Sequence, residues 1–165
     1  MECQNRLSEL ICDLPRECYS WKKPVSEYSP ISGLTRRLVI APETCPTKSM
    51  SMWVVSLDRQ KANALDGTFD IHDGVEEAWY GLKGRVKIFT PNESCILKPG
   101  GFVWIPAGMP HGARPIRGKA VFIAIYAPAR GGRERNRLVS AQEGKRLARE
   151  IVRKTASWRR THTAR

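Results

Sequence analysis

The sequence predicts an all-β fold, an antiparallel barrel or sandwich, for most of the chain. Between residues 34 and 127, segments rich in β-branched and aromatic residues recur at intervals of about 8–12 residues. Turn residues separate these segments, as in the Asp73-Gly74 and Lys83-Gly84 pairs. No helix of useful length is expected among them, which argues against a parallel α/β fold.

The predicted strands begin near Thr35 and follow one another to Ala127. Leu38–Ile40 is short and β-rich, Met52–Leu57 is a stronger candidate, and Asp58–Gly67 is expected to be a polar loop. The remaining candidates are Thr68–His72, Glu77–Leu82, Arg85–Thr90, Ser94–Leu97, Phe102–Ile105 and Ala120–Ala127. Residues 34–128 are therefore expected to form one barrel.

Two segments flank this predicted barrel. Residues 1–33 are expected to form an N-terminal extension, in which Leu7, Leu10 and Ile11 fit one face of a short helix. Residues 129–165 are expected to form a basic C-terminal helix and tail after a linker at residues 129–132. The helix is predicted over Ser140–Lys154, and Ser140 with Glu143 fits a capping box.

The net charge of +12 is concentrated in the C-terminal segment, because residues 128–165 hold 12 Lys and Arg against 3 Asp and Glu. Such a surplus could bind nucleic acid or an acidic surface. We favour a basic amphipathic helix that packs on the barrel and is followed by a solvated end, since no helix-turn-helix, zinc-finger or RNA-binding signature accompanies the charge. The apolar face is narrow and no apolar run approaches about 18 residues, so no membrane association is expected.

The five cysteines are odd in number and include no Cys-x-x-Cys pair. This pattern argues against a disulfide framework or a structural zinc knuckle, and it favours a reducing compartment. The N-terminal residues resemble neither a signal peptide nor a transit peptide. We therefore expect a cytoplasmic protein.

Candidate metal ligands lie in two clusters. Asp70 and His72 are two residues apart on a predicted strand, so both project to one face. Across the Asp73-Gly74 turn, Glu77 can return a carboxylate to the same place. His111 follows a Pro-x-Gly-x-Pro turn that ends a later strand. If the shared face is the barrel interior, these side chains can reach one ion.

The spacing of these clusters resembles the two motifs of the cupin superfamily. His72 is followed after four residues by Glu77 and after six more by Gly84, and the second cluster places Gly100, Pro106, Gly108 and His111 at the family intervals. The 15 residues from Arg85 to Pro99 between the motifs suit a compact single-domain cupin. The resemblance implies an antiparallel cupin, or jelly-roll, β-barrel.

By the same resemblance, His72, Glu77 and His111 correspond to metal ligands. Asp70 stands where the family usually has its first histidine. Asp70 could be a fourth ligand, a general base, or a hydrogen-bond partner of a ligand. Two imidazoles with one or two carboxylates favour Fe(II), Mn(II) or Zn(II) over copper.

Further site residues are predicted from alternation along the strands. Trp79, Trp104 and Arg114 are candidates for the substrate pocket, and Tyr80 joins Asp70 as a candidate catalytic residue. Core packing is the alternative for the tryptophans, and a surface position is the alternative for Arg114.

The resemblance implies a metal-dependent enzyme on a small organic metabolite, with the metal as a Lewis acid. Single-domain cupins include dioxygenases, isomerases, decarboxylases, lyases and cyclases, and the extra carboxylate of Asp70 favours lyase, isomerase or cyclase chemistry over oxygen insertion. The alternative is a non-catalytic ligand-binding or regulatory cupin whose basic tail contacts a partner or nucleic acid. A homodimer is the family expectation.

Overall fold

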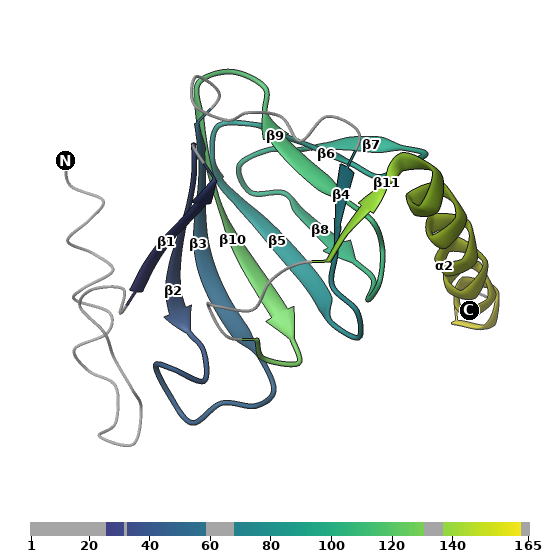
Figure 1. Cartoon of the computed structure of the whole chain (residues 1–165), viewed down its shortest axis with the longest axis horizontal. Coiled ribbons are helices and arrows are strands. Elements are labelled where there is room, and N and C mark those ends of the chain that lie inside the picture. Colours follow the sequence, from purple (N-terminus) through teal and green to yellow (C-terminus); the bar gives the residue numbers. More distant parts are fainter. Residues whose placement is uncertain (1–25, 32, 59–67, 131–136, 163–165) are drawn as a thin grey trace.

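The computed structural model describes residues 26–31, 33–58, 68–130 and 137–162. The largest layer is a six-stranded antiparallel sheet (Figure 1). In spatial order it contains β1 (Ser26–Ile31), β2 (Leu34–Ile40), β3 (Ser51–Asp58), β10 (Lys119–Ala127), β5 (Glu76–Lys83) and β8 (Phe102–Ile105).

Two smaller sheets lie opposite this layer. One contains β7 (Ser94–Leu97), β6 (Val86–Phe89) and β9 (Gly112–Pro115), and the other pairs β11 (Arg137–Ser140) with β4 (Thr68–Ile71). An isolated antiparallel bridge between Asp70 and His111 joins β4 to the chain just before β9. All the strand pairs are antiparallel, which confirms the predicted fold class.

The core lies between these layers and follows strand alternation. On β3 every second residue from Ser51 to Leu57 is buried, and β10 buries Ala120, Phe122, Ala124 and Tyr126 in the same way. Apolar side chains from other strands of this sheet and from the facing sheet of β6 and β7 complete the cluster: Leu38, Trp79, Ile105, Val86, Ile88 and Leu97. Burial of this apolar surface is the main force that holds the sheets together.

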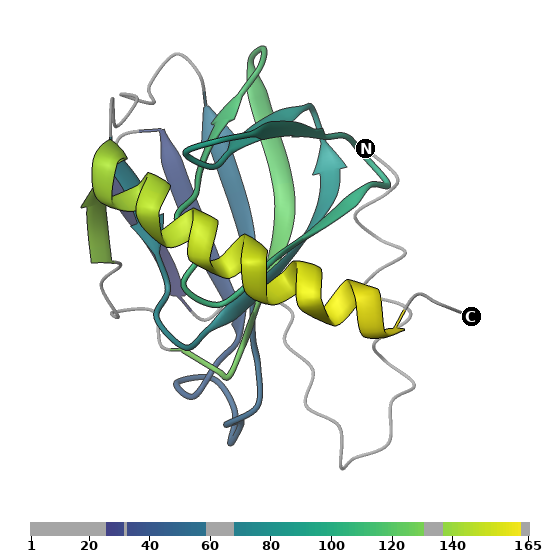
Figure 2. The same cartoon turned by 90° about the vertical axis from the view of Figure 1, so that its right-hand side faces the viewer.

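The helix α2 (Ala141–His162) lies across the outside of the smaller sheets (Figure 2). The Ser140 hydroxyl accepts a hydrogen bond from the backbone nitrogen of Glu143 at 3.3 Å, which confirms the Ser140 half of the predicted capping box, whereas the Glu143 carboxylate accepts from Arg137. Ala148 is buried in the core, and a Cβ on Gly144 would lie 3.0 Å from Pro91 and 3.6 Å from Pro110. The absent side chain at Gly144 thus lets the helix approach the loop that carries His111.

Some segment boundaries differ from expectation. β1 lies inside the predicted N-terminal extension and pairs with β2, so the sheet begins before residue 34. β11 returns from the predicted C-terminal segment to pair with β4, and α2 continues past Lys154. The predicted helix near Leu7 and most of the predicted polar loop lie outside the described residues. Over the described ranges, no helix is long and apolar enough to cross a membrane.

Candidate metal centre

The Asp70–His111 bridge brings the first two histidines together. The Asp70 nitrogen donates to the His111 carbonyl at 2.8 Å, and the His111 nitrogen donates to the Asp70 carbonyl at 3.0 Å. His72 follows β4 by one residue, so its ring lies beside that of His111 with centroids 5.3 Å apart. The turn before His111 needs Gly108, whose φ is 75°.

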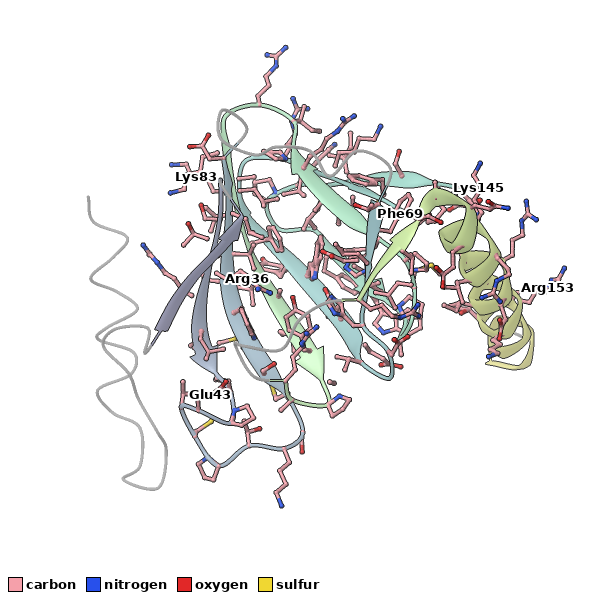
Figure 3. All side chains as sticks on the ribbon, in the orientation of Figure 1. Arg36, Glu43, Phe69, Lys83, Lys145 and Arg153 are labelled. Carbon is pink, nitrogen blue, oxygen red and sulfur yellow. The ribbon has the colours of Figure 1, made fainter. Side chains whose placement is uncertain are left out.

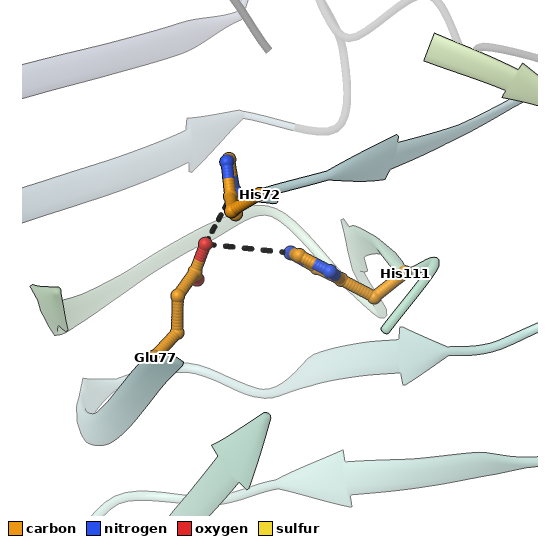
Figure 4. Close-up of side chains that lie close together, drawn as sticks. All are labelled: His72, Glu77 and His111. Carbon is orange, nitrogen blue, oxygen red and sulfur yellow. Dashed lines mark ion pairs between the residues drawn. The ribbon is translucent and has the colours of Figure 1, made fainter. Parts of the chain in front are cut away.

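Glu77 reaches both imidazoles from the facing sheet (Figure 4). Its Oε1 contacts Nε2 of His72 and lies 3.7 Å from Nε2 of His111. All three residues are buried, and one ligand atom from each lies within 4.8 Å of the others. Within the described part of the chain, these residues form the one such group.

The donor set and its support fit a divalent metal. The Trp79 indole donates to Glu77 Oε2 at 2.5 Å, which orients the carboxylate. Nδ1 of His111 lies 2.9 Å from the Met109 carbonyl. A carbonyl can only accept, so Nδ1 of His111 carries a proton and Nε2 is the ring atom directed toward Glu77. A set of two imidazoles and one carboxylate suits Fe(II), Mn(II) or Zn(II).

Charge around Glu77 keeps it ionised. Burial raises the pKa of Glu77, but positive charge on His111 and His72, with hydrogen bonds from His72 and Trp79, outweighs burial and lowers the pKa below its ordinary value. A carboxylate held in this form is ready to ligate a cation without first losing a proton.

Tyr126 is a neutral group beside the cluster. Its ring meets that of His72 edge-on with centroids 5.5 Å apart. Burial, followed by the charge of Glu77, raises the pKa of Tyr126 far above its ordinary value, against the opposing charges of Arg36 and Arg130. The phenol therefore stays protonated and can donate a hydrogen bond.

Asp70 lies near the three residues but is not in the group whose ligand atoms converge. Its side chain is half-buried, and its charge contributes to the raised pKa of Tyr126. The Asp70 carboxylate therefore acts on the same interior as Glu77. Whether it serves as ligand, base or hydrogen-bond partner stays a prediction.

Three predicted site residues lie elsewhere. Tyr80 and Trp104 are 46% and 45% exposed, because they occupy the outward positions of β5 and β8. Trp104 donates to the exposed Glu76 at 3.4 Å, and Arg114 is exposed on β9. The expectation that these three side chains face the interior is corrected. Trp79 does face the interior, where it stacks on Phe122 with centroids 4.7 Å apart.

Arg130 is a site residue that sequence reasoning missed, having placed it in a linker. It is only 5% exposed, and its Nη1 hydrogen-bonds Nδ1 of His72. Strand alternation gave no signal for it, because β10 ends at Ala127 and both Ala127 and Pro128 are exposed.

An antiparallel barrel around a buried cluster of two histidines and one carboxylate is the arrangement that the resemblance to cupins implies. Residues 59–126 match the model of the family described as "Cupin domain". This match spans both motifs and confirms their resemblance to a cupin domain.

Solved structures agree at the level of the fold. KdgF from Halomonas sp. is 20% identical, with 64% of this chain and 87% of that chain covered and a TM-score of 0.52. An RmlC-like cupin from Shewanella frigidimarina is 16% identical, with 69% and 93% covered and a TM-score of 0.53. Oxalate decarboxylase OxdC from Bacillus subtilis, in a mutant form, is 15% identical, with 67% and 29% covered and a TM-score of 0.52. No curated protein matches the sequence.

Proposed function

We propose that this chain is a metal-dependent enzyme acting on a small organic molecule, with the ion held by His72, Glu77 and His111. The observation that carries the proposal is the buried convergence of two imidazoles and one carboxylate. Three protein ligands leave coordination positions for substrate. A bound divalent ion supplies Lewis acidity toward a substrate oxygen.

Proton transfer is the chemistry that the neighbouring groups support best. The Asp70 carboxylate can accept a proton, and the Tyr126 phenol, whose pKa is raised, can donate a hydrogen bond to a developing negative charge. This pairing favours a lyase, isomerase or cyclase over oxygen insertion. Trp79 and the Met109 carbonyl hold Glu77 and His111 in place during such a step.

Metal analysis tests the proposed ligands. The chelated protein is titrated with Mn(II), Zn(II) or anaerobic Fe(II), separated from free metal, and assayed for bound ion. We expect about one ion per chain, lost in Glu77→Gln and retained in the matched control Glu76→Gln, whose carboxylate is exposed. Equal retention by the two variants contradicts the assignment. Screening the loaded protein against small metabolites by NMR then tests turnover.

A non-catalytic binding protein is the second candidate, favoured by the basic face of α2. Lys145 and Arg153 point from this helix away from the barrel (Figure 3). The exposed basic residues that form this face are Lys145, Arg146, Arg149, Arg153 and Lys154. Such a face could hold an acidic partner. Replacing Lys145, Arg149 and Arg153 with glutamate should abolish retention on heparin in this case and leave metal content unchanged. Retention equal to that of wild type argues against this candidate.

A further inference from the structure

Arg130 places a buried positive charge beside a metal ligand. The segment that carries it is fixed to β3 and the preceding loop, because the Arg130 nitrogen donates to the Ser51 hydroxyl at 3.3 Å and the Ala129 nitrogen donates to the Lys48 carbonyl at 3.1 Å. The guanidinium also lies over the Tyr126 ring, 5.4 Å from its centroid. Burying a guanidinium is costly unless it gains partners, and Nδ1 of His72 is one partner of Arg130.

The hydrogen bond from Arg130 determines where His72 carries its ring proton. A guanidinium has five N–H donors and no acceptor, so Nδ1 of His72 accepts and the proton of the neutral ring sits on Nε2, facing Glu77. His111 has the opposite arrangement, with its proton on Nδ1 toward the Met109 carbonyl. His111 is therefore arranged to receive a metal through Nε2, whereas His72 is not.

A metal on Nε2 of His72 is incompatible with this hydrogen bond. If Nε2 of His72 ligated a metal, the proton of the neutral ring would sit on Nδ1. Nδ1 would then be a donor facing a second donor, Nη1 of Arg130. Loading of the site would therefore release this part of the guanidinium from His72 while the Arg130 backbone stays fixed to Ser51.

The charges around Tyr126 indicate what the released guanidinium binds. The charged side chains with the main effects on this phenol are two carboxylates, Glu77 and Asp70, and two guanidiniums, Arg36 and Arg130. These four charges cancel, so a divalent ion leaves an excess of positive charge that an anionic ligand can offset. The planar fork of an arginine matches a carboxylate in particular.

Arg36 supplies a second cation to the same interior. It points from β2 toward the barrel interior (Figure 3), and its Cζ lies 4.8 Å from the centroid of the Trp53 ring. The Nε of Arg36 is buried and makes no hydrogen bond to the described residues. The Trp53 and Tyr126 rings meet edge-on with centroids 5.8 Å apart. Arg36 lies over the first ring and Arg130 over the second, so the two guanidiniums are on one pair of aromatic rings.

We propose that Arg130 is the carboxylate-binding residue of the metal pocket and that metal loading makes it available by breaking its hydrogen bond to His72. This inference rests on the proposed metal site and adds the class of ligand, a small organic carboxylate. Metal and carboxylate then bind with positive coupling, because each favours the arrangement in which Arg130 has left His72.

Calorimetric titration of Zn(II) into the chelated protein, with and without acetate, tests the coupling. In wild type we expect acetate to tighten zinc binding by about fivefold or more. Arg130→Gln should bind zinc at least as tightly without acetate, because it has no such hydrogen bond to break, and should lose the acetate effect. Arg114→Gln, an exposed arginine on β9, is the matched control and should behave as wild type. Acetate also binds zinc in solution, equally in every sample, so the difference between proteins carries the result.

The remaining outcomes are equally decisive. Arg130→Lys keeps the buried charge but loses the fork, and we expect zinc binding with a reduced acetate effect; this variant covers the case in which Arg130→Gln fails to fold. An acetate effect in Arg130→Gln equal to that of wild type overturns the proposal. So does a stronger effect of inorganic phosphate than of acetate on wild type. If wild type binds none of Zn(II), Mn(II) and Fe(II), both this proposal and the proposed function fail, whereas metal binding that ignores acetate removes only the role of Arg130.

Discussion

The Trp79 indole donates a hydrogen bond to Oε2 of Glu77 while Oε1 of the same carboxylate faces the two imidazoles. Each oxygen of Glu77 thus has a separate partner, one the Trp79 indole and the other the two imidazoles of the proposed metal site. This arrangement is typical of metal sites in which an outer hydrogen bond orients a ligand.

Trp79→Phe should weaken metal binding by about 10–100-fold, because it removes the N–H that orients Glu77 but retains a ring to pack against Phe122. Competition of the variant with a chelator for Zn(II) measures the change. Trp104→Phe is the matched control, since its N–H reaches only the exposed Glu76 at 3.4 Å, and it should bind zinc as wild type does. Equal losses in the two variants contradict the role of Trp79.

Asp70→Asn should leave zinc affinity within about threefold of wild type, because the backbone bridge that positions His111 does not use the Asp70 side chain. The same change should lower turnover strongly if the carboxylate is the base. Titration and kinetics on one preparation separate these effects. A large loss of zinc affinity identifies Asp70 as a ligand, and replacement by histidine, the usual residue of the family, should then restore it.

The metal-free protein should lose stability in acid partly through Glu77. The pKa of Glu77 is lowered in the folded state, so its contribution is fully present above the unfolded-state value of about 4.3 and is lost as pH falls through the lower folded-state pKa. The difference in free energy of unfolding between wild type and Glu77→Gln should therefore be largest near neutral pH and shrink below about pH 4. Urea unfolding across this range measures it. A difference that is constant or grows in acid contradicts the assignment.

Gly144→Leu should separate α2 from the barrel. A Cβ at this position already approaches Pro91 to 3.0 Å, and a larger side chain would press on the turn before His111 through Pro110. Overpacking of this kind costs about 1–3 kcal/mol. Gln142→Leu, an exposed position on the same helix, is the control and should change stability by less than about 0.5 kcal/mol. Thermal unfolding of the two variants makes the comparison.

The fold and three site residues were predictable because their signals are local. Strand alternation and the Asp73-Gly74 turn indicate that His72 and Glu77 can share a face, and the resemblance to the cupin motifs added His111 to them. The same alternation excludes Tyr80, since Glu77 and Trp79 take the inward positions of β5 and leave residue 80 outside. Trp104 fails in the same way, because its neighbour Ile105 is the buried one.

The sequence did not allow Arg130 to be assigned to the buried site. Its position depends on the path of the chain beyond β10, where backbone contacts to Lys48 and Ser51 turn the segment back over the barrel. These contacts join residues far apart in the sequence, and no local periodicity encodes them. A Pro-Ala-Arg-Gly-Gly run reads as a linker by composition, although its arginine is buried.

X-ray absorption spectroscopy of the zinc-loaded protein tests the central claim most directly. The account predicts one ion bound by nitrogen and oxygen at about 2.0–2.2 Å, with the scattering pattern of two imidazoles. Loss of one imidazole is expected in His111→Ala. A sulfur ligand at about 2.3 Å, or a spectrum that is the same in wild type and His111→Ala, would show that the ion lies elsewhere and would contradict the site of His72, Glu77 and His111.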